Sequence, residues 1–324
     1  MTYNNSLQGR FFSSSYSLGV MLLVSLSLWI AGTLYGIGSK EGLFPSLRAC
    51  FINDYLARGV SLLSYVATAI VLARLYLFER RLQRLSVIFI WLSSVMMFLH
   101  ADFISALSAL LFVLAIAQLI SCNQPQGDER ALFGAFAFLS FLSLFLLYFA
   151  LLLPLFIIYL VVANICNIRN LAASFLGCIT PYWLLLGVIF VFPSLDGLLL
   201  PLQFCFVDIK TVASLSFTPL VSILFVMEIA VWAVALYFFY SSSLPAKPLL
   251  RRRFIFLFLS NAYILILSLI LPQAYTMFLG WRLSGFAVMV SYTFALGITK
   301  MSNIYFIILN ITWFAIATMC LWIG

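Results

Sequence analysis

Residues 131–168 read ALFGAFAFLSFLSLFLLYFALLLPLFIIYLVVANICNI, a tract with Pro154 inside it and no charged residue. As one continuous helix at about 1.5 Å per residue it would measure roughly 57 Å, whereas the hydrocarbon core of a bilayer is about 30 Å thick. The tract is therefore too long for one span. We predict two membrane helices here, or a folded-back pair, near 131–150 and 155–168.

The rest of the chain has the same character. It has 324 residues, of which 65% are hydrophobic and 8% charged, and its mean hydropathy is +1.18. In soluble domains about a quarter of the residues are charged. We predict an all-α polytopic bundle of about eleven spans (ten to twelve) in a single membrane-embedded domain, 1–324. Besides the pair above, spans are expected near 18–37, 60–77, 85–99, 103–120, 171–192, 217–240, 254–271, 283–299 and 304–323. Because further spans follow at once, 18–37 is interpreted as an uncleaved first span and not as a signal peptide.

The positions of the lysines and arginines predict the orientation of the chain in the membrane. One basic cluster contains Arg74, Arg80, Arg81 and Arg84, and a second contains Lys247 and Arg251 to Arg253. Two spans in the 131–168 tract put both clusters on the same side, which the positive-inside tendency identifies as the cytoplasm. The N-terminus is then inside and the C-terminus outside. The loops 78–84 and 241–253 are cytoplasmic, and the loops 38–59 and 193–215 lie on the outer face. The net charge of +8 is explained by topology and not by nucleic acid.

Two ionisable residues are predicted within or near spans. Glu228 lies near the centre of 217–240, and an ionisable group at that depth is a functional candidate. The alternative is a protonated glutamate that clamps two helices together, and no partner can be named. Arg282 lies at the outer end of the tenth span, or about 12 Å inside if the helix begins at Ala274. It would hold a phosphate or carboxylate; the alternative is an interfacial anchor beside Trp281.

Further candidates lie on the predicted outer face. His100 and Asp102 form a tight turn there, suited to proton transfer or to capping the next helix. Glu41 and Asp54 are the carboxylates of the first outer loop, where a glycosyl or phosphoryl transferase would place a base. No metal-site spacing is found among the six cysteines, and no cofactor motif is found anywhere in the sequence.

Two stretches of the sequence resemble known families of membrane proteins. The hairpin LHADF at 99–103, followed by SALSAL at 105–110, resembles the turn and helix of GT-C-type polyprenyl-phosphate-sugar glycosyltransferases. The region 133–181, with RNL at 169–171 and TPY at 180–182, is also similar. Together with RLS at 282–284 and the final helix pair, that region looks more closely like an uncharacterised family of bacterial polytopic inner-membrane proteins.

The GT-C resemblance implies a catalytic acid on the first outer loop and an outer-leaflet groove for a polyprenyl phosphate. Only Glu41 or Asp54 could match that acid, and neither lies in the paired-acid context of active members. The alternative that the chain is a non-catalytic relative of these enzymes therefore stays open.

Three functional hypotheses follow. The first is GT-C-like handling of a lipid-linked or envelope substrate at the outer leaflet, with Glu41 or Asp54 as base and Arg282 holding a phosphate. The second is a transporter or channel-like protein in which Glu228 binds a proton or cation. The third is a non-catalytic scaffold subunit. The expected location is the bacterial inner membrane, and the expected partners are membrane lipids, a polyprenyl phosphate and envelope-complex proteins.

Overall fold

A computed structural model of the chain describes ten segments and the single residue His100. The described residues are 15–34, 54–74, 85–96, 100, 103–122, 128–145, 147–192, 219–241, 248–270, 279–296 and 300–323.

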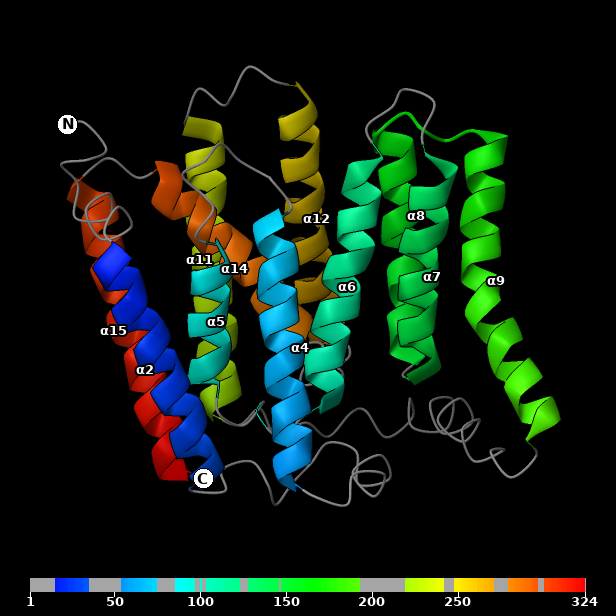
Figure 1. Cartoon of the computed structure of the whole chain (residues 1–324). Coiled ribbons are helices and arrows are strands. Elements are labelled where there is room, and N and C mark those ends of the chain that lie inside the picture. The colour runs from blue at the N-terminus through cyan, green and yellow to red at the C-terminus, as the bar shows by residue number, and fades with distance from the viewer. Residues whose placement is uncertain are drawn as a thin grey trace. The chain divides into compact units, whose positions relative to one another are not determined.

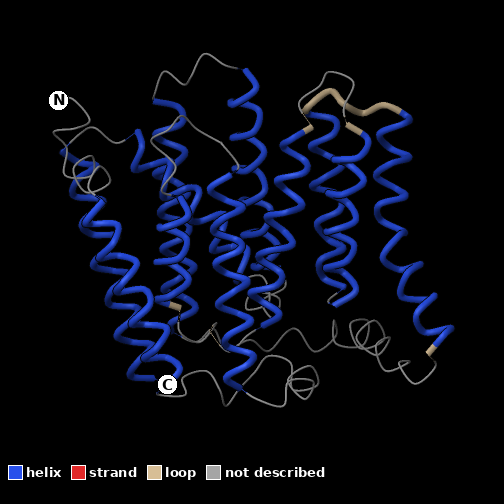
Figure 2. The backbone as a smooth tube through the Cα atoms, viewed as in Figure 1, coloured by secondary structure: helices blue, strands red, loops and turns tan. Residues whose placement is uncertain are grey.

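Within these residues the fold is entirely helical, with eleven α-helices, one 3-10 helix and no strand (Figures 1 and 2). This confirms the predicted all-α class. The helices are α2 (Ser15–Leu34), α4 (Asp54–Arg74), α5 (Leu85–Val95), α6 (Phe103–Ser121), α7 (Glu129–Phe145), α8 (Leu153–Val162), α9 (Ile168–Val191), α11 (Pro219–Ser241), α12 (Pro248–Ile270), α14 (Leu279–Leu296) and α15 (Lys300–Ile323), with the 3-10 helix η4 (Leu147–Leu152) between α7 and α8.

Three of these helices are long and apolar enough to cross a membrane: Tyr16–Leu34, Tyr55–Arg74 and Ile168–Val191. Each of the eleven predicted apolar segments overlaps chiefly with one α-helix of the described residues, and 131–150 also includes the first residues of η4. Two of the predicted loops contribute to helices, because α4 begins at Asp54 and α12 at Pro248. Long apolar helices with exposed hydrophobic side chains indicate a membrane protein.

The 131–168 tract is broken, as its length requires. α7 ends at Phe145, η4 follows, and the chain turns back into α8 (Figure 1). Pro154 lies in the first turn of α8. Because the first turn of a helix has no backbone acceptors for its N–H groups, a proline there costs no hydrogen bond. Inside a continuous helix the same residue would break the backbone ladder.

The chain divides into two compact units. The first contains residues 1–109, 216–251 and 276–324, and the second contains residues 110–215 and 252–275. In the first unit α5 packs against α2, α4, α14 and α15, and α11 packs against α14. Its core includes the fully buried rings of Tyr65, Phe89, Trp281 and Trp313. Phe286 of α14 stacks on Trp313 of α15, with ring centroids 5.4 Å apart.

In the second unit, α7 and α9 approach closely along a face of small and polar residues. Gly177 of α9 lies against the backbone of Phe133, and a Cβ atom there would overlap the Phe133 carbonyl oxygen. The Ser140 hydroxyl donates to the Cys178 carbonyl at 2.5 Å, and the hydroxyls of Ser143 and Tyr182 are hydrogen-bonded at 2.6 Å. Small residues with polar cross-links are the usual means of joining helices in a membrane, where lipid removes the hydrophobic driving force.

Candidate functional site

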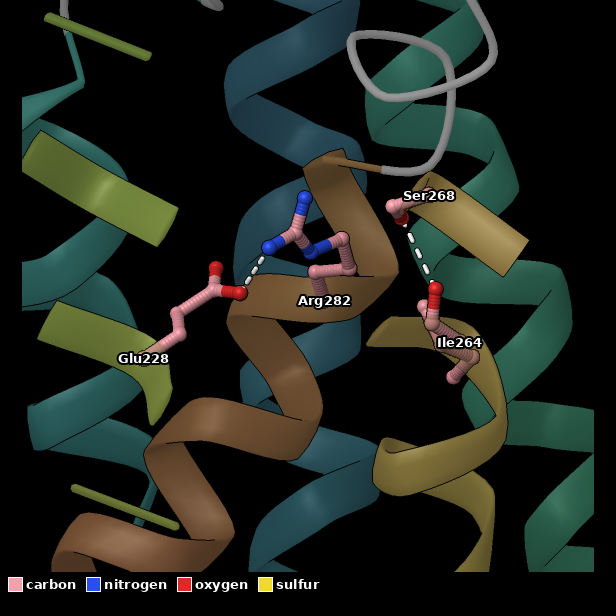
Figure 3. A network of polar contacts seen from close by, with 4 residues as sticks. All are labelled: Glu228, Ile264, Ser268 and Arg282. Carbon is pink, nitrogen blue, oxygen red and sulfur yellow. Dashed lines mark hydrogen bonds and ion pairs between the residues drawn. The ribbon is translucent and has the colours of Figure 1, made fainter. Parts of the chain in front are cut away.

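A buried ion pair joins α11 and α14. The Nη2 atom of Arg282 donates to Oε2 of Glu228 (Figure 3). The exposed fractions of the two side chains are 2% for Arg282 and 10% for Glu228. Of the six predicted site residues, these are the two that the structure brings together, and the pairing answers the question of Glu228's partner.

The apolar run of 219–241 explains why Glu228 is buried. It is the tenth residue of the 23-residue helix α11, nine positions after Pro219. At 1.5 Å per residue, its Cα lies about 14 Å along the helix axis from that end. The neighbouring residues are apolar on both sides, so the helix supplies no counter-charge of its own. The counter-charge has to come from another helix.

Arg282 is held in place by the start of α14. It lies in the first turn, between the buried side chains of Trp281 and Leu283. Its Cζ atom also lies 5.8 Å from the centre of the Phe225 ring of α11, within the range of a cation–π contact. The helix dipole opposes a cation near a helix N-terminus, and the Glu228 carboxylate supplies the negative charge that offsets it.

The close approach of α14 depends on a glycine. A Cβ atom at Gly280 would overlap the carbonyl oxygen of Ser105 in the first turn of α6, within the same unit. Gly280 therefore lets α14 lie against that backbone and carries Arg282 inward. An interfacial anchor would expose its guanidinium to water, whereas here the group is buried on Glu228.

The pair has a defined chemical asymmetry. Arginine stays protonated in proteins, whereas a carboxylate can take up a proton. Both ions have lost most of their hydration, and either one left alone in this environment would be costly. The pair is therefore stable only while the two charges are together, or while Glu228 is neutral and another anion occupies Arg282.

A second polar cluster lies among α2, α4 and the turn after α5. Arg58 is 5% exposed and donates from Nη1 to the Gly32 carbonyl at 2.7 Å. The fully buried ring of His100 stacks on Trp29, with centroids 3.5 Å apart and planes 9° apart. Arg58 belongs to the loop 38–59 that the sequence places on the outer face, where a cation is expected to be exposed. Its buried position depends on the tertiary structure, in which α2 and α4 both pack against α5 and Arg58 of α4 reaches the Gly32 carbonyl of α2.

The surroundings of His100 keep its imidazole neutral. Burial and, to a smaller extent, the positive charge of Arg58 lower the pKa of His100 to about 3. The backbone carbonyls of Ser93 and Ser94 act in the opposite direction, and burial dominates. A role in proton transfer would need an opening that exposes this ring.

The side chains of the remaining predicted site residues lie outside the part of the chain that the structure describes. Glu41 and Asp102 lie outside the described residues. Asp54 is the first residue of α4, and its side chain is also outside the described set. The catalytic roles assigned to these residues stay predictions. Within the described part of the chain, no three His, Cys, Asp or Glu side chains gather as a metal site would require.

Comparison of the chain with family models, with curated proteins and with solved structures found no match. The functional conclusion therefore depends on the geometry of the Glu228–Arg282 pair.

Proposed function

We propose that the chain is a multi-pass inner-membrane carrier whose transport site contains the Glu228–Arg282 ion pair. In this proposal the eleven helices span the membrane, with the N-terminus in the cytoplasm and the C-terminus outside. The topology is supported by the positive-inside tendency, which places 12 of the 17 lysines and arginines on the cytoplasmic side.

The observation that carries the proposal is the burial of both charges between two apolar helices. A buried ion pair seldom stabilises a protein more than a well-packed apolar pair would, because desolvation offsets the attraction. Stability alone is thus a poor reason for placing two charges here. Ionisable residues inside membrane segments usually mark the path of a substrate, an ion or a proton.

The position of the pair fits a carrier. Glu228 lies near the middle of α11, about 14 Å from its start, which is close to half of a 30 Å hydrocarbon core. Substrate sites of secondary transporters lie near that depth. The pair is occluded in this structure, as expected for a carrier between its two open states.

The test is uptake by the full-length protein in liposomes. Vesicles are incubated with a panel of carboxylates, phosphates, a short-chain polyprenyl phosphate and monovalent cations, and their contents are measured by mass spectrometry. The wild type should accumulate at least one compound above empty vesicles. The double variant Glu228→Gln/Arg282→Gln removes both charges without leaving one unpaired, and should lose uptake while remaining folded.

A matched control comes from the same helix. The Ser291 hydroxyl of α14 is buried and donates to the Ala287 carbonyl of its own helix. Ser291→Ala therefore removes a buried polar group without touching the pair, and should transport like the wild type. If the double variant also transports like the wild type, the pair is a packing clamp. If the wild type accumulates nothing, the carrier proposal fails.

A further inference from the structure

The ion pair is electrically neutral, and only one of its members can change charge. Arg282 stays positive, so a state in which it leaves Glu228 loses the negative charge of that carboxylate, and an anion bound in its place would replace it. Among the described residues, Arg282 is the charged group that acts on Glu228, through its positive charge and its hydrogen bond. The charge state of each residue is thus tied to that of the other.

Binding of an external anion to Arg282 would release Glu228 into apolar surroundings. A carboxylate buried without a cation is far less stable than the corresponding carboxylic acid. The released Glu228 should therefore bind a proton. The bound state then contains the arginine cation, the external anion and a neutral glutamic acid, so its net charge is zero, as in the empty state.

We propose that the Glu228–Arg282 pair is an exchange site at which the chain takes up an oxyanion, a carboxylate or phosphate group, together with one proton. On binding, the hydrogen bond from Arg282 to Glu228 is replaced by one from Arg282 to the oxyanion, and the proton goes to the Glu228 carboxylate. On release, the proton leaves Glu228 and the ion pair forms again. Transport of a monovalent anion is then electroneutral. The inference rests on the carrier proposed above and specifies its substrate class and its coupling.

The geometry favours an oxyanion over a cation. A cation at this site would have to compete with Arg282 for Glu228 while the guanidinium stayed buried beside it. An oxyanion instead matches the forked donors of the guanidinium and takes over the position of the carboxylate. The Phe225 ring at 5.8 Å contacts the guanidinium in either state, so Arg282 keeps part of its surroundings when Glu228 departs.

The inference can be tested by counting protons at equilibrium. Full-length protein in lipid nanodiscs is titrated at pH 7 with sodium lactate, sodium sulfate and a short-chain polyprenyl phosphate. Isothermal titration calorimetry is performed in two buffers of different ionisation enthalpy. At least one probe should bind with uptake of about one proton per monovalent anion, since the released carboxylate is neutralised.

Variants separate the two steps. Glu228→Gln should bind the same anion without proton uptake, and Arg282→Gln should not bind it. Ser291→Ala should behave like the wild type. Because Glu228→Gln removes the carboxylate to which the buried Arg282 donates and can fail to fold, the proton count on the wild type is the primary measurement. Binding without proton uptake in the wild type overturns the inference, and so does the failure of all three probes to bind.

The failure of this inference is distinguishable from failure of the carrier proposal. Liposomes that accumulate a cation, or an anion without movement of protons into a lumenal pH dye, support a carrier and contradict the exchange site. Liposomes that accumulate nothing contradict both. Accumulation of an anion with a matching rise in lumenal acidity, lost in the double variant, supports both.

Discussion

The buried pair makes a sharp prediction about stability. Glu228→Gln keeps the volume of the side chain but removes the carboxylate that is paired with Arg282, which is 2% exposed. Arginine cannot avoid this by losing its proton. Breaking a buried pair in this way costs about 3 to 5 kcal/mol of folding free energy.

Substitution of the partner, Arg282, should cost less folding free energy. Arg282→Gln leaves a glutamate that can become neutral, so the loss is nearer the cost of an unsatisfied hydrogen bond, about 1 to 3 kcal/mol. With both residues changed to glutamine, no charge is buried and the amides can pair. The double variant should lie within about 1 kcal/mol of the wild type. The coupling energy between the two positions should therefore be about 3 kcal/mol or more.

The assay is equilibrium unfolding of the full-length protein in mixed micelles with a rising mole fraction of sodium dodecyl sulfate, followed by tryptophan fluorescence. Ser291→Ala is the control for loss of a buried polar group on α14. The reasoning is refuted if the single variants add to the double variant within about 0.5 kcal/mol. It is also refuted if Glu228→Gln is no more destabilising than the control.

Three further predictions concern packing and pH. Gly280→Ala should destabilise the protein by about 1 to 3 kcal/mol in the same unfolding assay, because its Cβ would overlap the Ser105 carbonyl; an unchanged unfolding midpoint would show that α14 does not lie against α6. Gly177→Val should likewise separate α9 from Phe133 and lower the thermal stability of the protein. It should also reduce the yield of a disulfide engineered between α7 and α9. An undiminished disulfide yield would contradict this packing. The lowered pKa of His100 means that the unfolded chain binds a proton below about pH 6.5 while the folded chain does not. Stability should therefore be complete above that pH and decrease by about 1.4 kcal/mol per pH unit as the pH falls towards 3. Comparison with His100→Phe, which keeps an aromatic ring for stacking, isolates this slope, and identical pH profiles would show that the imidazole is not buried.

The sequence by itself determined the helices. Hydropathy is a local property, so each apolar run specified a helix without knowledge of its neighbours. The break in 131–168 followed from length alone, because the uncharged tract is about twice as long as a span requires. Glu228 and Arg282 were also detectable singly, since an ionisable residue in or beside an apolar run is conspicuous wherever its partner lies. Glu41 and Asp102, which lie outside the described residues, stay predictions from sequence.

Only the tertiary structure decided the partners. Glu228 and Arg282 are 54 residues apart, and nothing in either run indicates that α11 packs against α14. That choice depends on the shapes of whole helix faces, such as the gap that Gly280 leaves for the backbone of α6. The stacking of His100 on Trp29 is likewise a consequence of α2 and α5 meeting. Burial and pairing are properties of several helices together, so a single run of sequence, read by itself, does not contain them.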